Sequence, residues 1–214
     1  MNKPTKRAVQ AMIATLRAVP AKRAFTYGES IQIARIQASK LRAWADAQEP
    51  EINLIWLVNQ RAVPVNFAPS HLLSEQSGLA TDHITGKLEM FINDGEPQVR
   101  QRFSLLHELK HVLDWPDADR MHSKLGSGDE ELKRRMIEWI ANEFAAQVLM
   151  PTRLIKRAWF MSQDLPLMAS LFNVSREAMT TRLEKLGLTG EPKPRPRVYF
   201  RTTGLTFADC ATCA

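Results

Sequence analysis

The chain has 214 residues, 44% of them hydrophobic, and a formal net charge of +6 at pH 7. This is the composition of an ordinary globular protein, and no apolar run approaches the ~18 residues that a membrane-spanning helix needs. The chain has two cysteines, too few for a disulfide framework, and its basic N-terminus lacks a signal-peptide pattern. We therefore expect a cytoplasmic protein with no membrane partner.

The first part of the chain is predicted to contain helices followed by a small sheet. Apolar residues at helical spacing predict helices within three segments, 1–26, 29–47 and 52–59. Three strands are then expected, at 62–67, 79–82 and 87–93. In the last of these segments Leu88, Met90 and Ile92 alternate onto one face, which is typical of a half-buried strand.

The next predicted helix, 100–115, contains the pattern His-Glu-x-x-His as His107, Glu108 and His111. Residues four apart lie on one face of a helix, so the two histidines can present ring nitrogens to one Zn²⁺ ion. Glu108 is placed to act as the general base that takes the proton of an attacking water. The same five letters also occur by chance on solvated helix faces, so a third ligand is needed to decide.

A polar segment, 115–131, follows this helix and is expected to be an irregular loop. Pro116, Gly126 and Gly128 argue against regular structure there. His122 lies in this segment and could contact a substrate or a transition state. The favoured interpretation is an ordinary exposed histidine, because exposed polar side chains need no explanation.

The helix predicted over 132–150 offers the third ligand. Glu138 borders its buried stripe and shares a face with Ala141, a small residue that lets a neighbouring helix approach closely. Asn142, one turn further on, could hold the Glu138 carboxylate as a supporting partner. The alternative is that Glu138 is an ordinary exposed acid, as Glu143 is expected to be.

Together these motifs resemble the ImmA/IrrE family of metallopeptidases, over about 77–188. The resemblance rests on two runs, Arg100-Gln101-Arg102-Phe103-Ser104 before His-Glu-x-x-His, and Glu138-x-x-Ala141-Asn142-x-Phe144-Ala145-Ala146 closing on Leu149-Met150-Pro151. It implies a zincin-like α+β fold, mostly helical, with a small sheet of about three strands. It also implies that His107, His111 and Glu138 hold one catalytic Zn²⁺ ion.

Lys110 departs from the family pattern, which usually has glycine at this position. Zinc-peptidase motifs generally avoid a charged residue between the two histidines. The Lys110 side chain could point outward, crowd the substrate cleft and lower activity, or bind an acidic residue of the substrate. The metal site is therefore a firmer prediction than vigorous catalysis.

Further substrate contacts are predicted only loosely. A second group that stabilises the oxyanion could be any of Tyr27, Tyr199, His122 and Arg102. By analogy with zincin-like folds, the strand 87–93 is a candidate edge strand that pairs with an extended substrate through main-chain hydrogen bonds.

Two further helices, 165–173 and 176–186, follow in helix-turn-helix order, with Ser175 as the expected N-cap of the second. DNA binding through the second helix is one interpretation. Packing of the pair on the peptidase core, as in the family, is favoured because fold resemblance does not fix function. The expected divisions are a peptidase domain, the helical pair and a basic tail, at 1–160, 161–190 and 191–214.

The tail is rich in proline and basic residues and ends in Cys210-Ala-Thr-Cys213. Its aromatic residues among arginines would suit DNA, with single strands favoured, although a basic linker ending in a short strand would look the same. Cys210 and Cys213 could form a redox couple, complete a metal site in a dimer, or inhibit the enzyme through a thiolate on the catalytic zinc. A disordered end is the favoured alternative for this pair.

The resemblance implies a zinc endopeptidase that cuts one helix-turn-helix repressor. Such cleavage would derepress stress-response, DNA-damage, mobile-element or phage-defence genes, and DNA is a predicted activator. The alternative is a catalytically weak regulator that keeps the zinc fold and acts by binding DNA or the repressor, and Lys110 keeps this alternative open. A toxin-like member of a two-gene module is a third interpretation.

Overall fold

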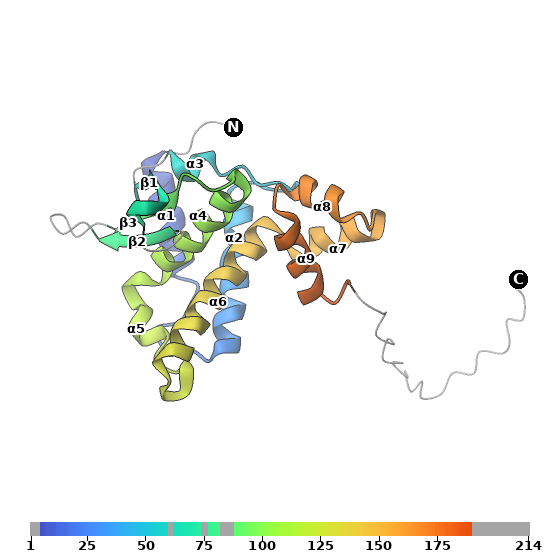
Figure 1. Ribbon diagram of the computed structural model, residues 1–214. Helices are drawn as coiled ribbons and strands as arrows, with labels where there is room; N and C mark the ends of the chain where they lie inside the picture. The colour runs from blue at the N-terminus through green and yellow to red at the C-terminus, as the bar shows by residue number, and fades with distance from the viewer. Residues whose placement is uncertain (1–4, 60–61, 74–76, 82–87, 190–214) are drawn as a thin grey trace, which may run out of the picture.

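The computed structural model describes residues 5–59, 62–73, 77–81 and 88–189, and it is mostly helical with one small sheet (Figure 1). Among these described residues, six helices precede residue 150: α1 (Lys6–Arg17), α2 (Tyr27–Trp44), α3 (Ile55–Val58), α4 (Gln98–Asp114), α5 (Ala118–Met121) and α6 (Glu130–Leu149). Three more follow: α7 (Thr152–Met161), α8 (Leu165–Phe172) and α9 (Arg176–Lys185). The predictions for the tail, including Tyr199, Cys210 and Cys213, lie outside the described residues. Within the described part of the chain, no helix is both long and apolar enough to span a membrane.

The sheet has three strands among the described residues, β1 (Val65–Ala68), β2 (Ser77–Thr81) and β3 (Leu88–Asn93), in the order β1-β3-β2. Strand β3 runs parallel to β1 and antiparallel to β2, and Met90 lies opposite both Val65 and Leu79. The prediction that 87–93 is an edge strand for substrate is therefore wrong. Both sides of β3 already pair with strands of this chain, so the sheet edges belong to β1 and β2.

Strand β3 leads almost directly into α4, and side-chain hydrogen bonds hold the turn between them. Gln101 Nε2 donates hydrogen bonds to the carbonyl oxygens of Asn93 and Glu96 at 3.2 and 2.9 Å. At the same time the side chains of Met90 and Ile92 are fully buried under the helices. The strand and the turn together set where the first turns of α4 begin.

Helix α6 is the central helix of the fold, because it packs against α2 on one side and α4 on another (Figure 1). The Asp129 side chain accepts hydrogen bonds from the first backbone N–H groups of α6, a normal N-cap. Its buried stripe recurs at helical spacing and consists of Ile140, Ala141, Phe144, Ala145, Val148 and Leu149. The packing holds α6 beside α4, and the candidate site lies between these two helices.

Glu143 of α6 is buried, so the prediction that it is an ordinary exposed acid is wrong. Arg35 of α2 donates a hydrogen bond to Glu143 Oε1 at 2.8 Å, and Arg182 of α9 lies 3.4 Å from the same oxygen. Arg182 also donates to the carbonyl oxygen of Met150 at 3.0 Å. A buried carboxylate needs such partners, and here they tie α9 to the central helix.

The segment between α4 and α6 contains short helical turns instead of the predicted irregular loop. After α4 come a 3₁₀ turn (Trp115–Asp117), α5 and a second 3₁₀ turn (Gly126–Gly128). Pro116 fits because the first turn of a helix needs no donor from it. Gly126 and Gly128 have φ of +74° and +94°, which their lack of a Cβ permits.

Helices α8 and α9 are joined by a tight turn that begins at Asn173, which adopts a left-handed conformation (φ +50°). The predicted N-cap is confirmed, because Ser175 Oγ accepts a hydrogen bond from the backbone N–H of Ala178 at 3.1 Å. Phe172 and Met179 are fully buried and join the main hydrophobic core. The pair thus packs on the core, as favoured, and its use in reading DNA stays a prediction.

Candidate metal centre

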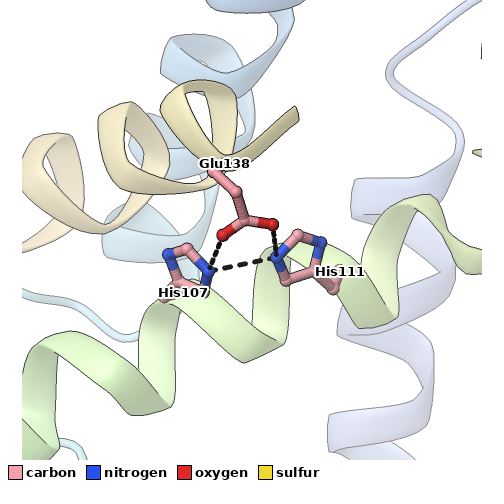
Figure 2. Close-up of side chains that lie close together, drawn as sticks. All are labelled: His107, His111 and Glu138. Carbon is pink, nitrogen blue, oxygen red and sulfur yellow. Dashed lines mark hydrogen bonds and ion pairs between the residues drawn. The ribbon is translucent and has the colours of Figure 1, made fainter. Parts of the chain in front are cut away.

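Helix α4 carries two histidines one turn apart, and α6 faces them with a glutamate (Figure 2). His107 and His111 point toward α6, and the buried apolar residues of α4 are Leu105, Leu106, Leu109, Val112 and Leu113. Glu138 reaches across from the third turn of α6, and its side chain is 52% exposed. The cluster is therefore assembled by two packed helices and remains open to solvent on one side.

The three side chains converge closely enough to surround one ion. Glu138 lies 3.0 Å from His107 Nε2 and 3.5 Å from His111 Nε2, and the two Nε2 atoms are 3.1 Å apart. One ligand atom from each residue lies within 4.8 Å of the others. Two imidazole nitrogens and one carboxylate form a donor set that catalytic Zn²⁺ prefers, with a position left for water. The residues present fit this metal.

The electrostatics of the cluster also suit a cation. Burial, together with the neighbouring His107, lowers the pKa of His111 to about 4, so its ring is neutral at pH 7. Burial would lower the pKa of His107 too, but Glu138 and Glu108 outweigh it and raise that pKa. The hydrogen bond from His107 lowers the pKa of Glu138, which stays ionised. At neutral pH the cluster offers a carboxylate and at least one free imidazole nitrogen.

Asn142 supports the cluster, through a different partner from the one predicted. Its Oδ1 accepts a hydrogen bond from His107 Nδ1 at 2.9 Å, whereas the sequence suggested that it would hold Glu138. This bond places the proton of the neutral ring on Nδ1 and leaves the Nε2 lone pair for a metal. Asn142 is one helical turn after Glu138, so the same face of α6 supplies both the acid and the support.

Replacing Asn142 with alanine is expected to lower zinc affinity by about 10–100-fold, because His107 loses the hydrogen bond that orients its ring. Competition with a chromogenic chelator measures the change. Thermal unfolding of the metal-free variant serves as the control and should match that of the unmodified protein. Unchanged zinc affinity would show that His107 is oriented by other contacts.

Glu108 lies beside His107 and is 4% exposed. Its negative charge is one of the influences that raise the pKa of His107, so the carboxylate is close to the cluster. A carboxylate beside the proposed ligands carries the charge that a general base needs. The sequence prediction for this residue therefore remains compatible with its place in the fold.

Lys110 is buried, and it points neither outward nor into a substrate cleft as the sequence suggested. Its side chain is 2% exposed, and its Nζ lies 2.5 Å from Asp114 Oδ1 on the same helix. The other carboxylate oxygen of Asp114 lies 3.4 Å from His122 Nε2. Burial would raise the pKa of Asp114, but Lys110 and His122 outweigh it and lower that pKa.

This network was missed by sequence reasoning, and it corrects the interpretation of His122. His122 is 4% exposed, so it is not the exposed loop histidine that was favoured. The spacing of Lys110 and Asp114, four residues apart on a helix, was a signal that could have predicted their ion pair. The contact between His122 and Asp114 could not be predicted from the sequence pattern, because it depends on how the segment after α4 folds back toward that helix.

The described candidates for a second oxyanion group all engage other partners. The Tyr27 ring packs edge-on against Trp139, with 6.2 Å between ring centroids. Arg102 donates a hydrogen bond to the carbonyl oxygen of Ile52 at 3.0 Å. His122 faces Asp114 as described above. The group that stabilises the oxyanion therefore stays a prediction.

Two histidines on one helix and a carboxylate from a second helix form the arrangement of zinc-dependent peptidases with a His-Glu-x-x-His motif. Sequence comparison agrees, because the family model described as the IrrE N-terminal-like domain (Peptidase M78) matches residues 59–184. The match covers more than half of the 214 residues. The chain belongs to this peptidase family, as its resemblance to the ImmA/IrrE metallopeptidases predicted.

Among solved structures, a Mycobacterium tuberculosis transcriptional regulator has a similar fold, with a TM-score of 0.53 at 17% sequence identity. The likeness covers 91% of this chain and 54% of that chain, so this chain spans about half the length of that regulator. At such low identity the likeness shows the fold alone. No curated protein matches this chain.

Proposed function

We propose that this protein is a zinc-dependent endopeptidase that cuts one partner protein, a helix-turn-helix repressor, at a specific site. The observation that carries the proposal is the convergence of His107, His111 and Glu138, with one ligand atom from each lying within 4.8 Å of the others. Membership of the Peptidase M78 family supports the peptidase class. Repressor cleavage follows from the resemblance to the ImmA/IrrE peptidases, and the likeness to a transcriptional regulator is compatible with it.

The residues of this chain divide the work of peptide hydrolysis. His107, His111 and Glu138 would hold Zn²⁺, and Asn142 keeps the His107 ring in the right tautomer. When bound, the metal lowers the pKa of water and polarises a carbonyl oxygen. Glu108 takes a proton from the attacking water and then passes it to the leaving amine. The solvent-exposed side of Glu138 is where an extended peptide can approach the cluster.

The competing interpretation, a regulator that acts only by contact, relied on Lys110. Because Lys110 is buried against Asp114, its side chain does not project into a substrate cleft. The lysine therefore no longer argues against catalysis. This leaves the peptidase as the function that the geometry supports best.

The test is incubation of the purified, zinc-quantified protein with the helix-turn-helix protein encoded beside it. We expect one zinc per chain and a single cut, which 1,10-phenanthroline abolishes and added Zn²⁺ restores. Stoichiometric zinc with no cut, both with and without DNA, would instead support the contact regulator.

Activation by single-stranded DNA is part of the proposal, although the basic tail that suggested it lies outside the described residues. Adding single-stranded DNA to the same pair is expected to speed the cut at low salt, where phosphate contacts are strongest. An unchanged rate at low salt would remove DNA from the proposal and leave the peptidase in place.

A further inference from the structure

A groove with a volume of about 520 Å³ lies beside the metal cluster, between α4, α6 and α9. Asn142 lines it, and the same side chain accepts the hydrogen bond from His107. Phe103, one turn before His107 on α4, and Ala146, one turn after Asn142 on α6, also line it. The groove is therefore a continuation of the helix faces that carry the proposed ligands.

The lining of the groove is mainly apolar, with charges at its rim. Phe103, Leu149 and Met150 contribute apolar surface from α4 and the end of α6, and Val174 and Ala178 contribute it from the helical pair. The volume falls within the ~300–1,000 Å³ typical of clefts that enclose small ligands. A groove of this size accepts a few side chains of a protein segment, and not a folded domain.

The rim charges indicate which segment fits. Arg100 lies 3.6 Å from Glu96, and its charge also acts on Glu177 across the groove, so two acids balance it. Lys185 on the last turn of α9 has no ion pair among the residues that the structure describes. One cation therefore remains available for a partner carboxylate.

We propose that this groove is an exosite that binds a segment of the protein substrate outside the scissile bond, with apolar side chains in the groove and a carboxylate facing Lys185. The proposal rests on the proposed peptidase function and explains how one substrate would be selected. It also gives the helical pair a role, because α9 forms one wall of the groove. On the exposed side of α9, Glu177 and Glu184 balance Arg176 and Lys185, so this helix has no cationic surplus that would favour DNA phosphates.

The test compares Thr181→Trp, which fills the groove from an exposed position, with Ser170→Trp, an exposed position on α8 outside it. For charge, Lys185→Glu is compared with Lys156→Glu on α7. Each groove variant is expected to raise KM for the intact repressor by at least about tenfold, the size of one lost anchor contact. Neither should change kcat, or cleavage of a short peptide that spans the cut. Control variants that raise KM for the repressor as much as the groove variants do would overturn the proposal. An equal rise in KM for the short peptide in the groove variants would overturn it too.

A second measurement does not depend on catalysis. The fluorescent probe 1-anilinonaphthalene-8-sulfonate combines apolar rings with an anion and is titrated into the metal-free protein. Thr181→Trp and Lys185→Glu are expected to raise the Kd of the probe at least about fivefold, a smaller factor than the roughly tenfold expected for the repressor. The control variants should leave this Kd unchanged. If the protein cuts nothing, the proposed function fails, and the probe alone decides whether the groove binds an apolar anion. Equal probe binding in groove and control variants would overturn the exosite in either case.

Discussion

Replacing Glu108 with glutamine is expected to lower kcat for peptide cleavage by about 10²–10⁴-fold, the usual contribution of a general base. Glutamine keeps the shape of the side chain but cannot accept the proton of the attacking water. Because His107, His111 and Glu138 are untouched, one zinc per chain should remain. The measurements are the single-turnover rate of repressor cleavage and the zinc content of the same sample.

The matched control for this variant is Glu138→Gln, a second acid-to-amide change, at a proposed metal ligand. The Glu138 carboxylate faces the Nε2 atoms of both His107 and His111, so its loss should weaken zinc binding itself. Zinc loss in Glu138→Gln with zinc retention in Glu108→Gln would separate a ligand from a base. A Glu108→Gln protein that still cuts at the original rate would contradict the assigned mechanism.

Helical periodicity was sufficient to find the elements that carry the site. The segments predicted at 100–115 and 132–150 correspond to α4 (Gln98–Asp114) and α6 (Glu130–Leu149), because each buries a long apolar stripe. The three strands were also found within a few residues. Their order was not, since alternation shows which side chains share a face and says nothing about which strand lies next to which.

The candidate site was likewise predicted only in part. His107 and His111 lie together because four residues make about one helical turn, and Glu138 because it borders the stripe that packs toward α4. Which side chain Asn142 contacts depends on the relative position of α4 and α6 along their axes. The spacing of apolar residues in the sequence does not give this offset. Glu143 was misjudged for a related reason, because its partners Arg35 and Arg182 come from helices far away in the sequence.

Lys110 is the clearest case in which the sequence raised a question that only the structure answers. Against the family glycine it suggested weakened catalysis, yet it is buried beside an acid on its own helix. The network it forms with Asp114 and His122 joins the end of α4 to the segment that leads into α6. A residue that looked like a defect in the motif is therefore part of what anchors the end of α4 to the segment that follows it.

Replacing Lys110 with methionine is accordingly expected to lower the free energy of unfolding by about 3–5 kcal/mol, because it leaves the Asp114 charge buried without its main partner. Urea denaturation of the metal-free protein measures this loss, and Lys124→Met, at an exposed lysine in the same region, is the control. A loss below about 1 kcal/mol, the size typical of an exposed pair, would show that His122 alone can compensate Asp114.

The double variant Lys110→Met with Asp114→Leu distinguishes a lost charge partner from lost packing. Replacing both members of a buried ion pair with apolar residues is often neutral or stabilising, whereas removing one member is costly. The double variant should therefore recover most of the stability that Lys110→Met loses, and zinc affinity is measured in the same three proteins. If stability returns while zinc affinity stays below that of the unmodified protein, the buried lysine also influences the metal site through its charge. The lysine in place of the glycine usual in the family would then mark a real difference in how this chain holds its metal.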